Sequence, residues 1–231
     1  MVCFSLFGVR VAIHPSIWAV LALMGYMLSG GEFGLLGVAL FVVAGFFSLL
    51  AHEMGHALVG RSLGGGIPMV ELAWLGGACV NEEVKLSRTG RVLTTLAGPL
   101  ASVALALPVL GWLIAAGGSL GNGLYLLGGM ILGMMPAVLV EQYPPMLALF
   151  AAYLVQVGVW WGVLNLLPIY PLDGGLIMTS LMHSPRKVHL FSMIAAIALA
   201  LLALYMGFLF MVFLLALLAF VNYNGIRNSP Y

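Results

Sequence analysis

Long apolar runs constrain the fold of this chain more than any other feature of its sequence. Several stretches approach the roughly 20 residues that a helix needs to cross the hydrocarbon of a bilayer. The chain is 63% hydrophobic and only 6% charged, and a soluble domain cannot bury that much apolar surface. The sequence has no repeated segments of about ten residues in which apolar and polar residues alternate, as the strands of a membrane barrel would require. We therefore expect an all-α polytopic membrane protein and not an outer-membrane barrel.

Hydropathy and turn residues divide the chain into six predicted transmembrane helices. Gly98 and Pro99 interrupt the third, which indicates close packing against neighbouring helices more than an end. The N-terminal segment lacks the basic region and cleavage site of a signal peptide, so we expect the first helix to be retained. The six predicted helices cover residues 16–28, 34–60, 91–116, 146–167, 188–204 and 205–221.

Three other segments do not read as complete spans. Residues 67–86 bring β-branched residues together with Gly76 and Gly77, which predicts a small β-hairpin. Residues 2–13 predict a short surface or edge segment. Residues 124–140 are apolar but broken by glycines and Pro136, so we expect a re-entrant, interfacial or double-dipping segment between spans three and four, with a seventh crossing as the alternative.

The basic residues predict the orientation of the chain in the membrane. If residues 124–140 do not make a full crossing, all eight Lys and Arg residues fall on one side. The turns on the other side hold only Glu32 and Glu141. Cytoplasmic loops carry the excess of basic residues, so we expect both termini and the β-hairpin in the cytoplasm. The eight basic residues are Arg10, Arg61, Lys85, Arg88, Arg91, Arg186, Lys187 and Arg227.

The second predicted helix carries near its end the motif His52-Glu53-Met54-Gly55-His56. Residues four apart on a helix differ by about 40° around the axis and about 6 Å along it, so both imidazoles can reach one metal ion. In such a motif the two histidines bind zinc and the glutamate takes a proton from water. Ionisable groups are costly in membrane-embedded sequence and are functional by default. We therefore predict a zinc site.

Two histidines leave a catalytic zinc site incomplete, because three protein ligands and a water are the usual set. Asp173 is the only aspartate in the chain, and the predicted topology brings it to the same side of the membrane as His52 and His56. We expect Asp173 to be the third ligand. The alternative is that it caps a helix beginning at Gly174, which aspartate often does.

Together these segments resemble a known family. Two motifs carry the resemblance: HEMGH at residues 52–56, and the later run from Asn165 to Gly174, which includes Pro168, Pro171 and Asp173. They are similar to the paired signatures of the site-2 protease family of intramembrane zinc metalloproteases. Within that family they resemble the branch related to sporulation-factor processing enzymes. The resemblance covers nearly the whole chain, so residues 1–231 are expected to form a single transmembrane metalloprotease domain, without the PDZ or CBS domains of many relatives. Three further matches are Ile13-His14-Pro15, Gly76-Gly77 and Ala97-Gly98-Pro99.

The resemblance implies a role for each site residue. His52, His56 and Asp173 would hold one zinc ion per chain, and Glu53 would be the general base. Asn165, in the same helix-face region two turns before the aspartate, would hold the substrate carbonyl or oxyanion. The alternative for Asn165 is a hydrogen bond between helices.

Substrate binding is expected at the hairpin. A substrate helix must unwind before its backbone can be attacked, and an extended peptide can pair with a strand edge near Gly76 and Gly77. The alternative is that these glycines only make a turn.

The predicted function is hydrolysis of peptide bonds in or near transmembrane segments, in a bacterial or archaeal cell membrane. The expected partners are a transmembrane protein substrate and the lipid bilayer, with room for a membrane regulator. No basic cluster with interleaved aromatics is present, which excludes nucleic acid as a partner.

The second enzyme alternative is a membrane-tethered zinc protease with a glutamate as third ligand. It is disfavoured, because Glu141 falls on the opposite side of the membrane from the HExxH motif.

The non-enzyme alternative is a catalytically silent membrane binding or chaperone protein with a structural zinc site. It is disfavoured because Glu53 and all three ligands are present. Cys79 would be a fourth ligand, a redox switch or simply a small apolar filler, which is the usual role of a free cysteine. We expect His14, His183 and His189 to be polar caps.

Overall fold

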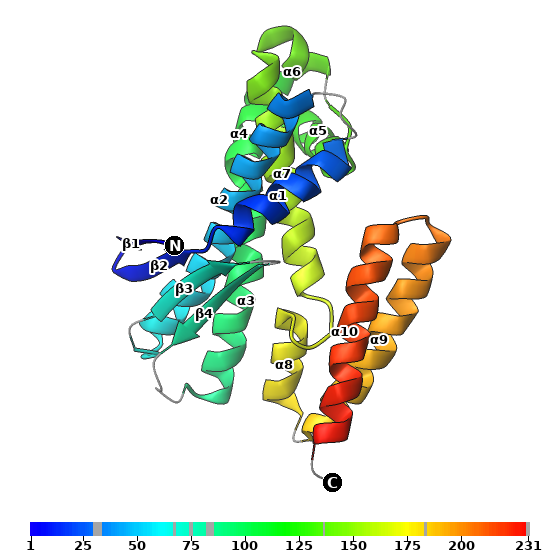
Figure 1. Cartoon of the computed structure of the whole chain (residues 1–231). Coiled ribbons are helices and arrows are strands. Elements are labelled where there is room, and N and C mark those ends of the chain that lie inside the picture. Colours follow the sequence, from blue (N-terminus) through cyan, green and yellow to red (C-terminus); the bar gives the residue numbers. More distant parts are fainter. Residues whose placement is uncertain are drawn as a thin grey trace. The chain divides into compact units, whose positions relative to one another are not determined.

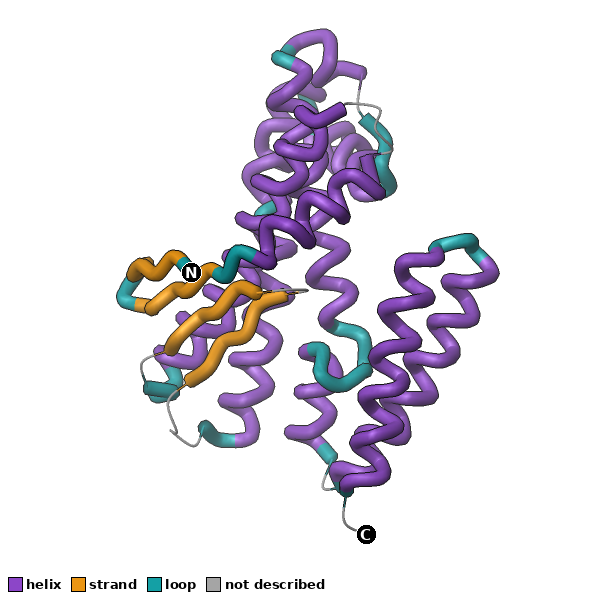
Figure 2. The backbone as a smooth tube through the Cα atoms, in the orientation of Figure 1, coloured by secondary structure: helices purple, strands orange, loops and turns teal. Residues whose placement is uncertain are grey.

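The computed structural model describes residues 1–29, 34–66, 68–73, 76–81, 86–135, 137–182 and 184–229. Glu32, Lys85, Pro136 and His183, used in the sequence arguments, lie outside these ranges. The described chain is mostly helical with one small sheet (Figure 2). Its residues divide into two compact units. Unit 1 comprises Met1–Lys85 and Ala97–Gly162, and unit 2 comprises Leu86–Leu96 and Val163–Tyr231.

The sheet of unit 1 has four strands in the order β1-β2-β3-β4 (Figure 1). β1 and β2 pair antiparallel, β2 and β3 parallel, and β3 and β4 antiparallel. Phe7 and Gly8 join the first two strands with positive φ angles of 49° and 77°, which suits a tight two-residue hairpin turn. The strands are β1 (Val2–Leu6), β2 (Val9–Ile13), β3 (Pro68–Ala73) and β4 (Gly76–Asn81).

The predicted hairpin is confirmed by β3 and β4, whose register sets Leu72 opposite Gly77. The prediction for residues 2–13 was incomplete, because this segment forms two paired strands and makes the sheet twice as wide. Val9 and Val11 are buried while Arg10 between them is exposed, the alternation of a strand with one covered face. Among the strands of the described residues β4 has one neighbour, β3, so its other edge is open to pairing.

The helices of unit 1 approach one another through small residues. A methyl group added at Gly55 would lie 2.4 Å from the carbonyl oxygen of Ala97, and one added at Gly158 would lie 2.6 Å from that of Ser102. Backbones in such close contact are typical of membrane helices. The helices that lie wholly or partly in unit 1 are α1 (Ser16–Ser29), α2 (Gly34–Ser62), α3 (Arg88–Ala104), α4 (Ala106–Gly117), α5 (Leu120–Ile131), α6 (Ala137–Gln142) and α7 (Pro145–Asn165).

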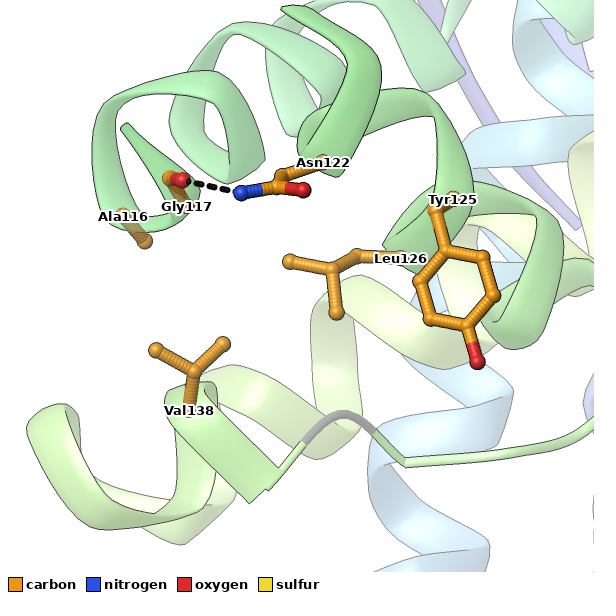
Figure 3. Close-up of a pocket in the computed structure, with 6 residues that line it drawn as sticks. All are labelled: Ala116, Gly117, Asn122, Tyr125, Leu126 and Val138. Atoms are coloured by element: carbon orange, nitrogen blue, oxygen red, sulfur yellow. Dashed lines mark hydrogen bonds between the residues drawn. The ribbon is translucent and has the colours of Figure 1, made fainter. Parts of the chain in front are cut away.

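Residues 124–140, predicted as a re-entrant or interfacial segment, contribute to the two short helices α5 and α6. Gln156 Nε2 and Trp160 Nε1 of α7 donate to the carbonyls of Met130 and Ile131 at 3.0 and 2.9 Å, which holds the end of α5. Neither short helix is long enough to cross a bilayer, and the re-entrant path stays a prediction. A shallow pocket lies between α4, α5 and α6 (Figure 3), lined by Ala116, Gly117, Asn122, Tyr125, Leu126 and Val138.

Unit 2 consists of α8 (Asp173–Leu181), α9 (Pro185–Tyr205), α10 (Leu209–Asn228) and the adjoining ends of α3 and α7. The helices α9 and α10 pack as a pair, with Gly207 at a φ of 81° in the short turn between them. A loop of residues 166–172 connects α7 to α8. Its Ile169 is buried in a core with residues of both long helices, Ala196, Ala203, Leu215 and Leu218.

Five helical segments of the described residues are long and apolar enough to cross a membrane. The third span continues through Pro99 as predicted. α1 occupies the place of the predicted first span, but its 14 residues would extend only about 21 Å, less than the roughly 30 Å hydrocarbon core. The chain is therefore a multi-pass membrane protein with five candidate spans: α2, Arg88–Gly117, α7, α9 and α10.

Candidate metal centre

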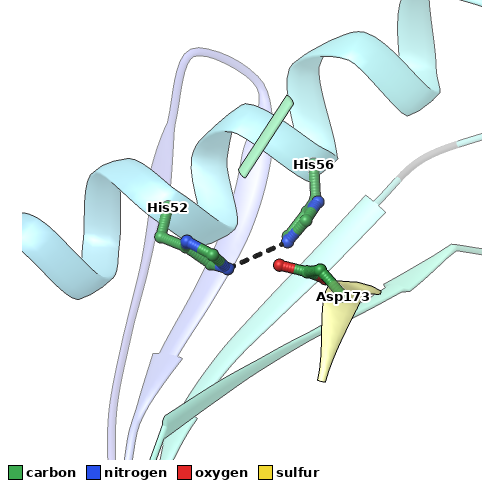
Figure 4. Close-up of side chains that lie close together, drawn as sticks. All are labelled: His52, His56 and Asp173. Atoms are coloured by element: carbon green, nitrogen blue, oxygen red, sulfur yellow. Dashed lines mark hydrogen bonds between the residues drawn. The ribbon is translucent and has the colours of Figure 1, made fainter. Parts of the chain in front are cut away.

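The last turns of α2 carry three buried ionisable side chains. His52, Glu53 and His56 are 2%, 4% and 9% exposed. The helical repeat brings the Nε2 atoms of the two histidines to 3.1 Å from each other (Figure 4). The two imidazoles therefore direct their Nε2 atoms toward one point, where both can bind a single metal ion.

Asp173 is the first residue of α8 and is only 6% exposed. The N-cap residue of α8 is Leu172. Asp173 is therefore not the N-cap residue, and the capping alternative does not describe its position. Two glycines follow because the helix starts directly against the preceding loop. A methyl group at Gly174 would lie 2.3 Å from the carbonyl oxygen of Leu166, and one at Gly175 would lie 2.3 Å from the Tyr170 nitrogen.

His52, His56 and Asp173 come together as predicted. Each offers one ligand atom, and these atoms all lie within 4.8 Å of one another (Figure 4). Two imidazole nitrogens and one carboxylate oxygen form a donor set typical of catalytic zinc sites, which leave a fourth position for water. The set fits one zinc ion per chain.

A glycine of α3 makes room for one of these ligands. A methyl group at Gly98 would lie 2.2 Å from Nε2 of His56 and 2.3 Å from the neighbouring ring carbon Cε1. Any side chain at this position would push the imidazole out of place. The sequence singled out Ala97-Gly98-Pro99 as a packing motif, but only the structure shows that the glycine accommodates a metal ligand.

The other glycine contact links Glu53 to the sheet. A methyl group at Gly77 of β4 would lie 2.3 Å from Cγ and 2.6 Å from Oε1 of Glu53. The backbone of β4 thus passes directly beside the predicted general base. Gly76, the other residue predicted to contact substrate, begins β4 and pairs with Ala73.

Cys79 lies two residues further along β4. Burial, together with the nearby charge of Glu53, raises the pKa of the Cys79 thiol to about 12. Cys79 is partly buried, and its role as a fourth ligand, a redox switch or an apolar filler stays a prediction.

The predicted position of Asn165 was partly wrong. Asn165 is the last residue of α7, and the loop 166–172 separates it from Asp173, so the two do not share one helix. Its role at the substrate carbonyl stays a prediction.

Two of the remaining histidines can be placed. His14 Nδ1 lies 2.7 Å from Ser16 Oγ and accepts from the Ser16 nitrogen at 3.2 Å at the start of α1, which confirms a polar cap. His189 does not cap α9. It pairs with Asn222 of α10 at 2.9 Å, a contact that nothing in the local sequence signals.

Comparison with known proteins agrees with this geometry. The model of the family described as Peptidase family M50 matches residues 40–214. A protein of Synechocystis sp. that is named as a zinc metalloprotease is 28% identical over 187 residues, which cover 77% of this chain and 42% of that protein. A zinc metalloprotease of Methanocaldococcus jannaschii is 24% identical over 180 residues, covering 78% and 44% of the two chains. The chain spans less than half the length of both relatives.

The fold is also similar to a solved structure. The site-2 protease from Methanocaldococcus jannaschii superposes with a TM-score of 0.56 and 21% sequence identity, over 99% of this chain and 94% of the other. At this identity the likeness concerns the fold.

Proposed function

The chain belongs to peptidase family M50, and from this premise we propose that it is an intramembrane zinc metalloprotease that hydrolyses peptide bonds in or near transmembrane segments of protein substrates. The observation that carries the proposal is the convergence of His52, His56 and Asp173 within 4.8 Å. The zinc metalloprotease names of two relatives support it. The paired motifs favour the branch that processes sporulation factors.

The side chains of the site divide the chemistry between them. His52, His56 and Asp173 would hold the metal, which when bound supplies Lewis-acid activation of a water and of the scissile carbonyl. The Glu53 carboxylate accepts a proton from the attacking water and passes it to the leaving amide nitrogen. Asn165 would donate a hydrogen bond to the substrate carbonyl oxygen. One water is consumed, and a carboxylate and an amine are released.

The open edge of β4 is the proposed binding site for the substrate backbone. An extended peptide can add to a strand edge through main-chain hydrogen bonds, and β4 has only β3 as a neighbour among the described strands. Gly77 of the same strand touches Glu53. A peptide paired with β4 would therefore run close to the general base. A substrate helix would have to unwind locally to bind there.

The proposed topology places both termini in the cytoplasm, with α1 as a sixth, short membrane helix. The one-sided basic residues support this orientation. Cys3 is exposed and provides the measurement. A membrane-impermeant maleimide should label Cys3 in inside-out vesicles and spare it in right-side-out vesicles; the reverse pattern would reject the orientation.

The proposed activity is tested by Glu53→Gln in the full chain co-expressed with tagged single-span substrates. The amide keeps the shape of the side chain but cannot take up a proton, so cleavage should fall about 10²–10⁴-fold while zinc content is unchanged. Glu71→Gln is the matched control, because Glu71 lies in β3 and is exposed. Equal processing by wild type and Glu53→Gln would reject Glu53 as the general base.

A further inference from the structure

A buried polar cluster in unit 2 surrounds the backbone of Tyr170, in the loop that leads to Asp173. The Tyr170 nitrogen donates to Ser192 Oγ of α9 at 3.0 Å, and Asn222 Nδ2 of α10 donates to the Tyr170 carbonyl at 2.6 Å. Ser192 and Asn222 are both 0% exposed. Tyr170 is partly buried, and backbone polar groups that face buried side chains need partners. Here both groups of one residue are bound by side chains from two different helices.

The other contacts of Asn222 fix its orientation. Its Nδ2 also donates to the Leu218 carbonyl at 2.8 Å, and its Oδ1 lies 2.9 Å from His189 Nδ1. Because the amide nitrogen already donates to two carbonyls, Oδ1 must be an acceptor, so His189 donates through a proton on Nδ1.

His189 is itself confined on two sides. A methyl group at Gly225 would lie 2.5 Å from its Nδ1. The ring of Tyr170 packs edge-on against its imidazole, with 5.0 Å between the ring centroids. His189 therefore holds Asn222 in the single orientation that binds Tyr170.

The backbone of Tyr170 packs directly against the first turn of α8. The space for a side chain at Gly175 is filled by the backbone of Ile169 and Tyr170, and the space at Gly174 by the carbonyls of Leu166 and Leu167. Backbone packed on backbone cannot yield as a flexible side chain does. A shift of the Tyr170 peptide would therefore move the first turn of α8, where Asp173 is located.

We propose that Asn222 and Ser192, with His189 supporting Asn222, are positioning residues for the metal ligand Asp173. The inference rests on the proposed function only in taking Asp173 as a zinc ligand. Groups hydrogen-bonded to a metal ligand typically contribute 10–100-fold to metal affinity, and we expect an effect of this order from residues that fix the backbone leading to the ligand. These residues bind the loop backbone and are not catalytic. A purely structural role would change the stability of the chain and leave its zinc affinity unaltered.

The test compares Asn222→Asp with Gln156→Glu in the full chain, purified in detergent. Both changes replace an amide by a carboxylate of the same shape and remove a donor to a backbone carbonyl. Gln156 of α7 holds Met130 of α5, both in unit 1, so it is the matched control. Zinc affinity is measured by competition with a chromophoric chelator, and the thermal midpoint is measured on zinc-free protein. Asn222→Asp should lower zinc affinity about 10–100-fold, and Gln156→Glu should leave it unchanged.

Ser192→Ala provides a second variant in case Asn222→Asp does not fold. It removes only the acceptor for the Tyr170 nitrogen, and zinc affinity should fall about threefold to tenfold, the value of one hydrogen bond. Wild-type zinc affinity in the folded variants, with a lowered thermal midpoint, would overturn the positioning role and leave the proposed function intact. A wild-type chain that binds no zinc would overturn both.

Discussion

The two regions that supply the metal ligands, the end of α2 and the start of α8, place their side chains by different means. On α2 the helical repeat alone sets His52 and His56 side by side, with Nε2 atoms 3.1 Å apart. At α8 the ligand follows a loop without regular structure, and that loop is bound by side chains of α9 and α10. Ligands on one helix turn depend on local geometry, whereas Asp173 depends on contacts between residues distant in sequence.

The neighbours of the two regions differ in the same way. Around α2 the constraint is steric, since only a glycine fits at Gly55, Gly77 and Gly98. Around α8 Gly174 and Gly175 are packed as tightly against backbone, and the loop before the helix is in addition bound by donors and acceptors of α9 and α10. A substitution that adds one methyl group should therefore damage either region, whereas one that removes a hydrogen bond should damage mainly the second.

The largest effect is expected for Gly98→Ala. The added methyl group would lie 2.2 Å from Nε2 of His56 and would displace a ligand itself. Zinc affinity should fall more than about 100-fold, beyond the range typical of residues that support a ligand. Gly111→Ala in α4 is the control, because nothing lies within 4 Å of the added methyl group. Chelator competition on both variants measures the difference, and unchanged affinity in Gly98→Ala would show that α3 does not constrain His56.

A smaller effect is expected from a proline scan of residues 78–81 in β4. Alternate N–H groups of a strand point to opposite sides, so one alternate pair faces β3 and the other faces the open edge. Proline at the edge-facing pair should retain zinc and lower cleavage of a tethered substrate about tenfold, the value of a lost main-chain hydrogen bond. Cys79→Ala is the control because it keeps the N–H group. Normal cleavage by every folded proline variant would contradict peptide addition to β4.

Much of the α2 region could be predicted because its determinants are local. The spacing of His52 and His56, the apolar run before them and the β-branched residues of the hairpin all lie within a few residues of the structure that they specify. Asp173 could be assigned because it is the only aspartate in the chain. The predicted hydropathy spans correspond to α2, α3 with α4, α7, α9 and α10.

The missed features rest on pairings between distant segments. The parallel pairing of β2 with β3 joins Arg10 to Met69 across two helices. Asn222 binds Tyr170 over a separation of 52 residues. Hydropathy could not show that α7 ends at Asn165, because the apolar run continues into the loop. Such contacts leave no periodic signal in one sequence.

The smallest effect is expected at the far end of α8, where Arg88 donates through Nε to the Ser180 carbonyl at 2.7 Å and through its terminal nitrogen to that of Leu181. A cation that binds the last carbonyls stabilises a helix C-terminus. Arg88→Gln removes this support from an exposed site, so zinc affinity should fall only about twofold to fivefold, consistent with the modest value of such contacts. Arg91→Gln is the control, because Arg91 donates to the Leu86 carbonyl just before α3. Chelator competition measures both. A loss as large as that of Asn222→Asp would mean that Asp173 is positioned by the whole of α8, and not mainly by the loop at its start.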